Sequence, residues 1–511
     1  MSLFEALFLP LGYPFSVAAD YGPYQLFDTL QQCAFFVNTV ISAQAIMKLH
    51  GVGDATVSPA TATALQFSRD LLARLFLLLV ATPSAISLYK RRAAPIRMLS
   101  GVLDAAGHLL EVLASIIASA VLPYAGPVVC TIGGTLGGAV RAVILQHFAE
   151  GGTAASWRPD YGDLALKESN QDKGGKLVGL ALGLMLLRMI GAQAGRPASE
   201  ADSLALVCFA ALSVVHVAGN AAAVQQLRLQ PAAAPATPAA APSSSWRRMF
   251  LPPGYPDSVS PEYRAYRLCA VARTLLGRPT ALVSSLFTWS WVYGVGDASR
   301  TPEQAVRIDI FLQAVAAVTA LAAGFPLFTR AFDYTQPRWK LLSALLAAAA
   351  GVLRFGASFV AHRPILFFST AAAAQAVAAF AGTAGAKVNG LIAPAFIKNR
   401  AAVQLVDIKV ADTNQAAAVD VVATLLCLAV LRRLAAAPPE TSALLAAYAA
   451  LQALDVAAAV GLYHYMPPLG AAREDESASR ASLVVEPEPE GAAASPGRRP
   501  RTPRRSRSSA V

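Results

Sequence analysis

The chain contains two copies of one unit, and this duplication constrains its architecture more than any other feature. The motif Phe-Leu-Pro-Leu-Gly-Tyr-Pro-Phe-Ser-Val at 8–17 returns as Phe-Leu-Pro-Pro-Gly-Tyr-Pro-Asp-Ser-Val at 250–259. The box His-Gly-Val-Gly-Asp-Ala at 50–55 returns as Tyr-Gly-Val-Gly-Asp-Ala at 293–298, and segment 163–171 returns at 407–415. Because the order of these segments is kept, the repeat is a domain duplication rather than a short solenoid repeat.

Composition marks the boundaries of the two units. The first unit is predicted at 1–230 and the second, more diverged unit at 246–468. Between them, 231–245 is rich in Pro, Ala and Ser, which is typical of a linker because such a segment has few large apolar groups to pack. The tail at 469–511 is acidic and then basic, and we expect it to be disordered.

The composition favours a membrane protein that does not bind nucleic acid. Hydrophobic residues make up 55% of the chain and charged residues only 14%, and the mean hydropathy is +0.48. These values lie outside the usual range of soluble domains. The net charge of +11 is misleading, because six arginines lie near the C-terminus and leave about +5 for the rest of the chain. These six are Arg498, Arg499, Arg501, Arg504, Arg505 and Arg507.

The cysteines indicate neither a disulfide framework nor a metal site. They are far apart and mostly within apolar runs, with no Cys-x-x-Cys pair. The five are Cys33, Cys130, Cys208, Cys269 and Cys427. The first ten residues show no basic segment, transit segment or cleavage site before the first motif, so we expect any targeting signal to be internal or to precede this sequence.

The units are predicted to be all-α. They are rich in Ala and Leu, lack alternating strand patterns and are punctuated by Gly and Pro. Three charge-free runs, 203–224, 310–329 and 364–386, have the length that a bilayer core requires. A fourth, 112–140, contains Pro and Gly and is either one kinked span or two shorter helices. The alternative is that all four are core helices of a large soluble domain, since alanine is only weakly hydrophobic.

Four segments in a fixed order resemble the root UVB sensitive family of plants, algae and other eukaryotes. They are the opening motif, the Gly-Val-Gly-Asp-Ala box, the segment Arg-Ala-Val-Ile-Leu-Gln-His at 141–147, and Asp-Leu-Ala-Leu-Lys-Glu-Ser-Asn-Gln-Asp at 163–172. The resemblance covers each unit nearly from end to end. The second unit departs from the family pattern, because Arg141 and His147 have no clear counterparts in it and Asp28 aligns with Ala270.

The resemblance implies helical, membrane-associated proteins without an established enzymatic reaction. In plants such proteins are linked to early seedling development, ultraviolet-B responses and vitamin B6 homeostasis. Plant members are often plastid proteins, which makes the plastid one candidate compartment here. Most members carry one unit, whereas this chain carries two.

The repeated box and the opening motif are expected to be structural. In the box, glycine is expected to end one helix, and Asp54 or Thr56 to cap the next by accepting backbone N–H groups; Asp297 is the equivalent of Asp54. Alternatively, Asp54 presents its carboxylate to a ligand or cation. The opening motif is a turn that places Tyr at a membrane interface, at a partner surface or at the entrance to its own domain. Its residues are Gly12, Tyr13 and Pro14 in the first unit and Gly254, Tyr255 and Pro256 in the second.

Asp104, His108 and Glu111 form the most suggestive polar group. Their spacing of four and three residues places all three on one face of a helix in an otherwise apolar segment. Ionisable groups in a membrane helix usually face a cavity or a partner, so the stripe is a candidate substrate or proton pathway. In the second unit the last position is Arg354, which suggests a structural ion pair between Arg354 and Glu111 as the alternative.

The box at 163–172 is polar and lies between apolar helices. Three of its side chains are repeated in the second unit, namely Asp163, Asn170 and Gln171, which return as Asp407, Asn414 and Gln415. These residues are candidates for binding a polar ligand, and helix capping by Asp and Asn is the alternative. Gln171 and Gln415 look least like caps, since an amide both donates and accepts hydrogen bonds.

We expect no enzymatic activity and assign no cofactor. No lysine is kept in both copies of the polar box to anchor pyridoxal phosphate, and no Gly-x-Ser-x-Gly, His-Glu-x-x-His or Walker motif occurs. The leading hypothesis is transport or cofactor homeostasis. The alternatives are a scaffold that uses its tail and the Tyr13 and Tyr255 turns, or an enzyme that uses the polar box. Expected partners are membrane lipid and further copies of this chain or its relatives.

Overall fold

The computed structural model describes residues 3–80, 88, 91–117, 119, 121–152, 161–191, 198–229, 259–295, 297, 299–324, 338–360, 363–395, 405–436 and 441–466. Within these ranges the chain is helical apart from short connections, which confirms the all-α prediction. The predicted linker at 231–245 and the predicted tail at 469–511 lie outside the described residues.

Each copy contributes six long helices to the described part of the chain. The first copy opens with the short helix α1 (Leu3–Phe8) and continues with α2 (Tyr21–Leu49), α3 (Pro59–Val80), α5 (Ala93–Ile116), α6 (Leu122–Glu150), α7 (Tyr161–Gly191) and α8 (Ala198–Gln226). The second copy consists of α10 (Glu262–Phe287) with the π-helical turn η1 (Thr288–Val292), α11 (Pro302–Ala323), α13 (Arg338–Phe359), α14 (Pro364–Ala395), α15 (Leu405–Ala436) and α16 (Thr441–His464).

The π-helical turn accounts for a difference in spacing between the copies. Tyr24 and Gly51 are 27 residues apart, whereas their equivalents Tyr266 and Gly294 are 28 residues apart. A π-helical turn accommodates one extra residue within a continuous helix, and η1 lies between the two equivalent positions of the second copy. Residues of α10 before η1 therefore align with α2 at an offset of 242, and residues after it at 243.

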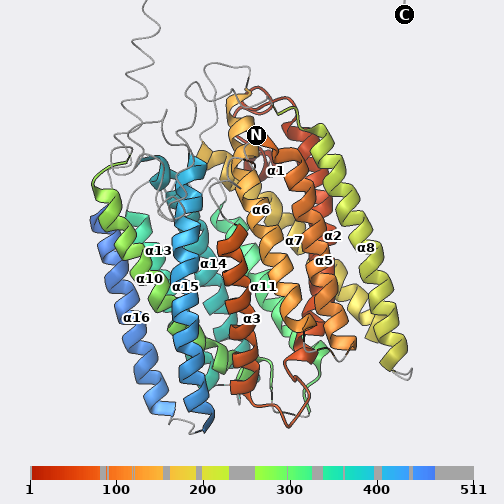
Figure 1. The fold of residues 1–511 in the computed structure, drawn as a ribbon, viewed down its shortest axis with the longest axis vertical. Helices are drawn as coiled ribbons and strands as arrows, with labels where there is room; N and C mark the ends of the chain where they lie inside the picture. Colours follow the sequence, from red (N-terminus) through yellow and green to blue (C-terminus); the bar gives the residue numbers. More distant parts are fainter. Residues whose placement is uncertain are drawn as a thin grey trace, which may run out of the picture. The chain divides into compact units, whose positions relative to one another are not determined.

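The two copies pack in an exchanged, pseudo-twofold manner. The order of motifs makes α3 equivalent to α11 and α7 equivalent to α15. The helix α3 packs along α15, and α11 packs along α7 (Figure 1). Exchanging the two copies turns the contact of α3 with α15 into the contact of α11 with α7. This is the relation that a twofold axis produces between like subunits.

Eight described helices are long and apolar enough to cross a membrane. Their most apolar windows lie in α5, α6, α8, α11, α13, α14, α15 and α16, and only 17–39% of each window is buried. Core helices of a soluble domain would bury most of such a surface. Large apolar side chains instead remain exposed along these helices, Val214 of α8 at 69% and Ile365 of α14 at 87% among them. The membrane prediction is therefore favoured over the soluble-core alternative.

The four predicted runs fall within these helices. Runs 203–224 and 364–386 lie inside α8 and α14, and the described part of 310–329 lies in α11. Run 112–140 belongs to two helices, since α5 ends at Ile116 and α6 begins at Leu122. Of the two alternatives, the structure therefore has two helices rather than one kinked span, and both helices extend outside the run.

Glycines in α6 allow close packing against α5 rather than breaking the helix. A Cβ atom on Gly126 would lie 2.6 Å from Glu111 Cγ, and one on Gly133 would lie 2.5 Å from Asp104 Oδ1. Small residues at such positions let membrane helices approach each other closely. The close approach brings the polar face of α5 against α6.

Candidate functional site

The polar box on α7 holds the N-terminal segment of the chain. Gln171 Nε2 donates to the Phe8 carbonyl at 2.7 Å and Asn170 Nδ2 to the Leu7 carbonyl at 3.0 Å. Lys167 Nζ donates to the carbonyl of Ala6. The last carbonyls of a helix have no partner within it, so these side chains satisfy the C-terminal end of α1.

Asp163 completes the same stripe of α7. Its Oδ2 accepts a hydrogen bond from the backbone N–H of Leu11 at 3.0 Å. Asp163, Lys167, Asn170 and Gln171 are spaced by four, three and one residues, so they share one helix face. The structure thus brings together the three predicted ligand residues of this box, but around the chain's own N-terminal segment.

The next face of α7 carries carboxylates held by α6. Arg141 Nε lies 3.0 Å from Glu168 Oε1, and Arg141 Nη2 lies 2.7 Å from Asp172 Oδ2. The Arg141 side chain remains 39% exposed, whereas that of Glu168 is only 5% exposed. A fork-shaped guanidinium suits two carboxylates at once, so the segment at 141–147 and the polar box form one network.

His147, at the end of α6, secures the start of α2. Its Nε2 lies 3.0 Å from Asp20 Oδ2, which also accepts the backbone N–H of Arg228 at 2.7 Å. Burial alone would raise the pKa of Asp20, but the hydrogen bonds from His147 and Arg228 lower it below its ordinary value. Next to this pair, the rings of Tyr21 and Phe148 are 5.2 Å apart in the buried core.

In the second copy Gln415, which aligns with Gln171, binds an arginine of α10. Arg267 Nε donates to Gln415 Oε1 at 2.9 Å, and Arg267 Nη1 lies 2.9 Å from Asp412 Oδ1. Asn414 is fully buried. Asp407 belongs to α15, but its side chain lies outside the described residues.

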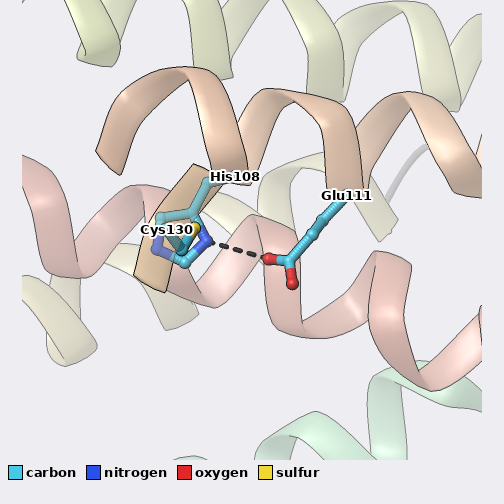
Figure 2. Close-up of side chains that lie close together, drawn as sticks. All are labelled: His108, Glu111 and Cys130. Carbon is cyan, nitrogen blue, oxygen red and sulfur yellow. Dashed lines mark hydrogen bonds and ion pairs between the residues drawn. The ribbon is translucent and has the colours of Figure 1, made fainter. Parts of the chain in front are cut away.

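In the predicted stripe on α5, His108 and Glu111 contact each other and residues of neighbouring helices. Asp104, His108 and Glu111 are all on α5, and Glu111 is buried while the other two are half-buried. Arg69 of α3 lies 2.7 Å from Glu111 Oε1. The other carboxylate oxygen, Oε2, accepts from Ser42 at 2.7 Å and lies 3.0 Å from His108 Nδ1 (Figure 2).

This ion pair corrects the predicted partner of Glu111. Arg354 of the second copy does not reach Glu111; its Nη2 donates to Gln375 Oε1 at 2.6 Å within its own copy. Arg69 also donates from Nε to the Pro123 carbonyl at 2.8 Å, and its side chain is only 3% exposed. The sequence pattern placed Glu111 on the correct face but could not find a partner 42 residues away on another helix.

Cys130 of α6 completes a group that has metal-ligand chemistry. One ligand atom each from His108, Glu111 and Cys130 lies within 4.8 Å of the others (Figure 2). Imidazole, carboxylate and thiolate together suit zinc. The Glu111 oxygens, however, already hold Arg69, Ser42 and His108, so the group is better described as an ion-pair network than as a metal centre.

The two Gly-Val-Gly-Asp boxes meet each other. Val52 and Val295 form an isolated antiparallel bridge between the copies. Beside it, the rings of His50 and Trp289 stack with centroids 4.4 Å apart. Gly53 has φ +89°, and a Cβ there would lie 2.9 Å from the carbonyl oxygen of Arg300 in the other copy. The boxes therefore close one end of the interface between the copies.

The capping predicted for these boxes is wrong in detail. Asp54 Oδ1 accepts from the backbone N–H of Thr56 at 2.8 Å, so it closes a local turn, and Asp297 does the same with Ser299 at 2.9 Å. The following helices are capped by other residues, Ser58 in the first copy and Thr301 in the second. These hydrogen bonds lower the pKa of both exposed carboxyls.

The opening turn lies against the start of α2. Gly12 has φ +79°, and Tyr13 is 38% exposed with its ring 6.0 Å from that of Tyr21. Pro14 follows in the same turn. The equivalent residues Gly254, Tyr255 and Pro256 lie outside the described residues.

Comparison with known proteins assigns both copies to one family. A family model described as "Vitamin B6 photo-protection and homoeostasis domain" matches twice, at residues 1–232 and 237–461. The chain belongs to the root UVB sensitive family. Two tandem copies of the family's domain are thereby confirmed.

Named relatives share part of their length with this chain. Protein root UVB sensitive 3 of Arabidopsis thaliana is 30% identical over 225 residues, 43% of this chain and 47% of the relative. RUS family member 1 of Dictyostelium discoideum is 29% identical over 187 residues, 36% and 34% of the respective chains. The matched region thus spans less than half the length of each of these relatives.

Solved membrane transporters share the fold. A D-xylose-proton symporter matches with a TM-score of 0.52 at 14% identity, over 88% of this chain and 98% of its own. The nucleoside transporter NupG matches with a TM-score of 0.50 at 11% identity, over 86% and 100%. At such low identity the likeness concerns the fold alone. It agrees with the eight apolar helices in describing a membrane protein.

Proposed function

We propose that this chain carries a small polar molecule across a membrane by alternating access between its two copies. The observation that carries the proposal is the exchanged packing of α3 on α15 and of α11 on α7. Two six-helix halves related in this way are typical of secondary transporters, in which the halves rock around a site between them. The fold shared with a symporter and a nucleoside transporter supports the same proposal of alternating access.

Contacts between the copies are of a kind that a rocking motion can break. Arg278 of α10 lies 2.9 Å from Asp70 of α3 and 3.1 Å from Asp420 of α15. Arg74 of α3 lies 3.5 Å from the same Asp420 carboxylate. Each ion pair that joins the copies includes one side chain that is a third or more exposed, Asp70 at 33% and Arg74 at 40%, so water can solvate its charge when the pair separates as the halves move.

The name of the matching domain supports a proposal for the substrate class. The matching domain is named for vitamin B6 homoeostasis, and we propose vitamin B6 compounds as the transported molecules. These compounds are small and polar and need a protein path across a bilayer, because uncompensated polar groups are costly in hydrocarbon. We propose that the charged side chains between the copies, with Arg278 at their centre, contribute to that path.

Uptake into liposomes tests this proposal. The full chain, purified and reconstituted, is expected to give saturable uptake of radiolabelled pyridoxine, pyridoxal or pyridoxal 5′-phosphate above that of protein-free liposomes. Arg278→Gln is expected to lower the uptake at least tenfold. Arg307→Gln is the matched control, since Arg307 is 47% exposed and pairs within its own helix. Uptake of no compound above background would refute the proposal.

Two finer points stay predictions. We propose that the chain acts without catalysis, and incubation of the purified protein with each vitamin B6 compound is expected to leave the compound unchanged. The plastid remains the compartment implied by the family resemblance. Fractionation of cells that express the tagged chain tests it, and recovery with another organelle would contradict it.

A further inference from the structure

One carboxyl group of the network on α7 has an oxygen without a hydrogen-bond donor. Glu168 Oε1 lies 3.0 Å from Arg141 Nε, whereas Glu168 Oε2 is buried and has no partner among the described residues. A buried, charged oxygen without a donor is costly, because it has lost its water and gained nothing in return. The arrangement therefore favours a further group bound at this oxygen.

The guanidinium of Arg141 is shared between two carboxyl groups. Arg141 Nη2 lies 2.7 Å from Asp172 Oδ2, and Asp172 lies one helical turn beyond Glu168 on α7. When two carboxylates share one site, their repulsion favours a proton on one of them. The side chain of Glu168 is 5% exposed and that of Asp172 is 26% exposed, so burial favours the proton on Glu168.

The surroundings add a third carboxylate but no second ion-pair partner for Glu168. Among the described residues, Arg141 is the cation in ion-pair contact with Glu168, while Asp28 acts on Glu168 and forms its own ion pair with Arg97 at 2.7 Å. The titratable and charged groups that face Glu168 or Asp172 are Tyr21, Tyr24 and Asp28 of α2, Arg97 of α5, Arg141 of α6 and Lys173 of α7.

The second copy has a single carboxylate at the equivalent place. Asp412 aligns with Glu168, whereas Ala416 stands at the position of Asp172. Asp412 Oδ1 lies 2.9 Å from Arg267 Nη1. One carboxylate and one guanidinium therefore pair there, and the second carboxylate is a feature of the first copy at this position.

A protonated Glu168 would have an acceptor on the same helix. Gln171 follows three residues later on α7, so the two side chains are neighbours on the helix surface. Its Nε2 donates to the Phe8 carbonyl at 2.7 Å and to the Tyr21 hydroxyl at 3.2 Å. Its Oε1 is buried and has no partner among the described residues. One O–H group on Glu168 would thus satisfy both orphaned oxygens.

We propose that Glu168 binds an exchangeable proton on Oε2 and donates it as a hydrogen bond to Gln171 Oε1. The proton comes from water, which reaches the network at its exposed side, where Arg141 is 39% and Asp172 26% exposed. The new O–H bond turns the Glu168 carboxylate into a neutral acid, and Arg141 keeps Asp172 as its one charged partner. The proposal does not require transport, since the proton is bound in the resting protein.

Infrared difference spectroscopy detects such a proton directly. The full chain in phosphatidylcholine nanodiscs is titrated from about pH 9 to about pH 5, a range in which ordinary carboxyl groups stay largely charged. The signal is the C=O stretch of a protonated carboxyl group. We expect a band whose midpoint lies at least about one pH unit above the ordinary Glu pKa of about 4.3.

Substitutions assign the band. Glu168→Gln removes the titrating group and is expected to abolish it. Asp172→Asn keeps Glu168 but leaves Arg141 to it alone, so the midpoint is expected to fall by about one pH unit, a tenfold loss of proton affinity. Glu150→Gln is the matched control, because Glu150 is exposed and accepts from Gln146 at 2.8 Å; its spectrum is expected to equal that of the unaltered chain.

Two results in the unaltered chain and in Glu168→Gln would overturn the proposal. One is the absence of any protonated carboxyl band above about pH 6. The other is a band that persists unchanged in Glu168→Gln protein that elutes as the native form. Asp172→Asn supplies an independent test if Glu168→Gln does not fold, since an unshifted midpoint in that variant would contradict the sharing of Arg141 on which the site depends.

Discussion

Replacing Glu111 with alanine is expected to destabilise the protein by several kcal/mol. The change leaves the guanidinium of Arg69 buried with only the Pro123 carbonyl as its remaining described acceptor, because its 2.7 Å contact with Glu111 is lost. It also removes the acceptor of Ser42 and the partner of His108. Three groups that Glu111 now satisfies, Arg69, Ser42 and His108, would be left incomplete.

The magnitude follows from the burial of the pair. The side chains of Arg69 and Glu111 are 3% and 7% exposed. Removing one partner of such a pair costs about 3–5 kcal/mol, mostly because an uncompensated charge stays buried. Replacing both partners, as Arg69→Met with Glu111→Leu, removes the charges together and is expected to recover most of the loss.

Equilibrium unfolding in mixed detergent micelles measures these differences. Glu303→Ala is the matched control, since Glu303 pairs with Arg307 on an exposed helix face and its loss is expected to cost less than about 1 kcal/mol. A cost for Glu111→Ala as small as that of the control would refute the reasoning. A double variant less stable than Glu111→Ala alone would refute it too.

Three further perturbations test other parts of the structure. Gln171→Ala removes the hydrogen bond to the Phe8 carbonyl and is expected to speed hydrogen exchange in α1 at least tenfold, whereas Gln146→Ala, whose side chain bonds within its own exposed helix turn, should not. Gly53→Ala, at φ +89° against a backbone carbonyl, is expected to cost about 1–3 kcal/mol in unfolding, and an effect no larger than that of Gly138→Ala, where a Cβ meets nothing within 4 Å, would contradict the geometry. Because the folded-state pKa of Asp20 is lowered, its contribution to stability is present above the ordinary Asp pKa of about 4 and is lost as the pH falls below that value through the lowered folded-state pKa; unfolding measured from pH 7 to about pH 2 is expected to be less pH-dependent for Asp20→Asn, and identical profiles would argue against this role.

Much of the fold could be predicted because the repeated motifs reveal the duplication. The two copies and the alignment of their equivalent boxes follow from motifs in a fixed order, and the helical class follows from an Ala- and Leu-rich composition without strand patterns. The charge-free runs identified only some of the apolar helices, because an apolar helix that contains even a few charged residues has no such run. The span in α5 was missed because Arg97, Asp104 and Glu111 interrupt its apolar run, although Arg97 and Glu111 form ion pairs with neighbouring helices.

The candidate site could be predicted less well, because its partners are distant in the chain. Spacing placed Asp104, His108 and Glu111 on one face, but nothing local identifies Arg69 as the partner of Glu111. The polar box was found from its repetition, whereas its occupant, the N-terminal helix, requires the tertiary structure.

Alternating access, as proposed, requires the two copies to move against each other and to open the end at which their Gly-Val-Gly-Asp boxes meet. Val52 and Val295 pair across an antiparallel bridge, a geometry whose Cα separation of about 4.5–5.5 Å suits a disulfide. The decisive measurement is vitamin B6 uptake by a Val52→Cys, Val295→Cys variant in which the five native cysteines are replaced. We expect uptake to be lost on oxidation and restored on reduction. Uptake that continues unchanged in the cross-linked protein would contradict alternating access between the two copies.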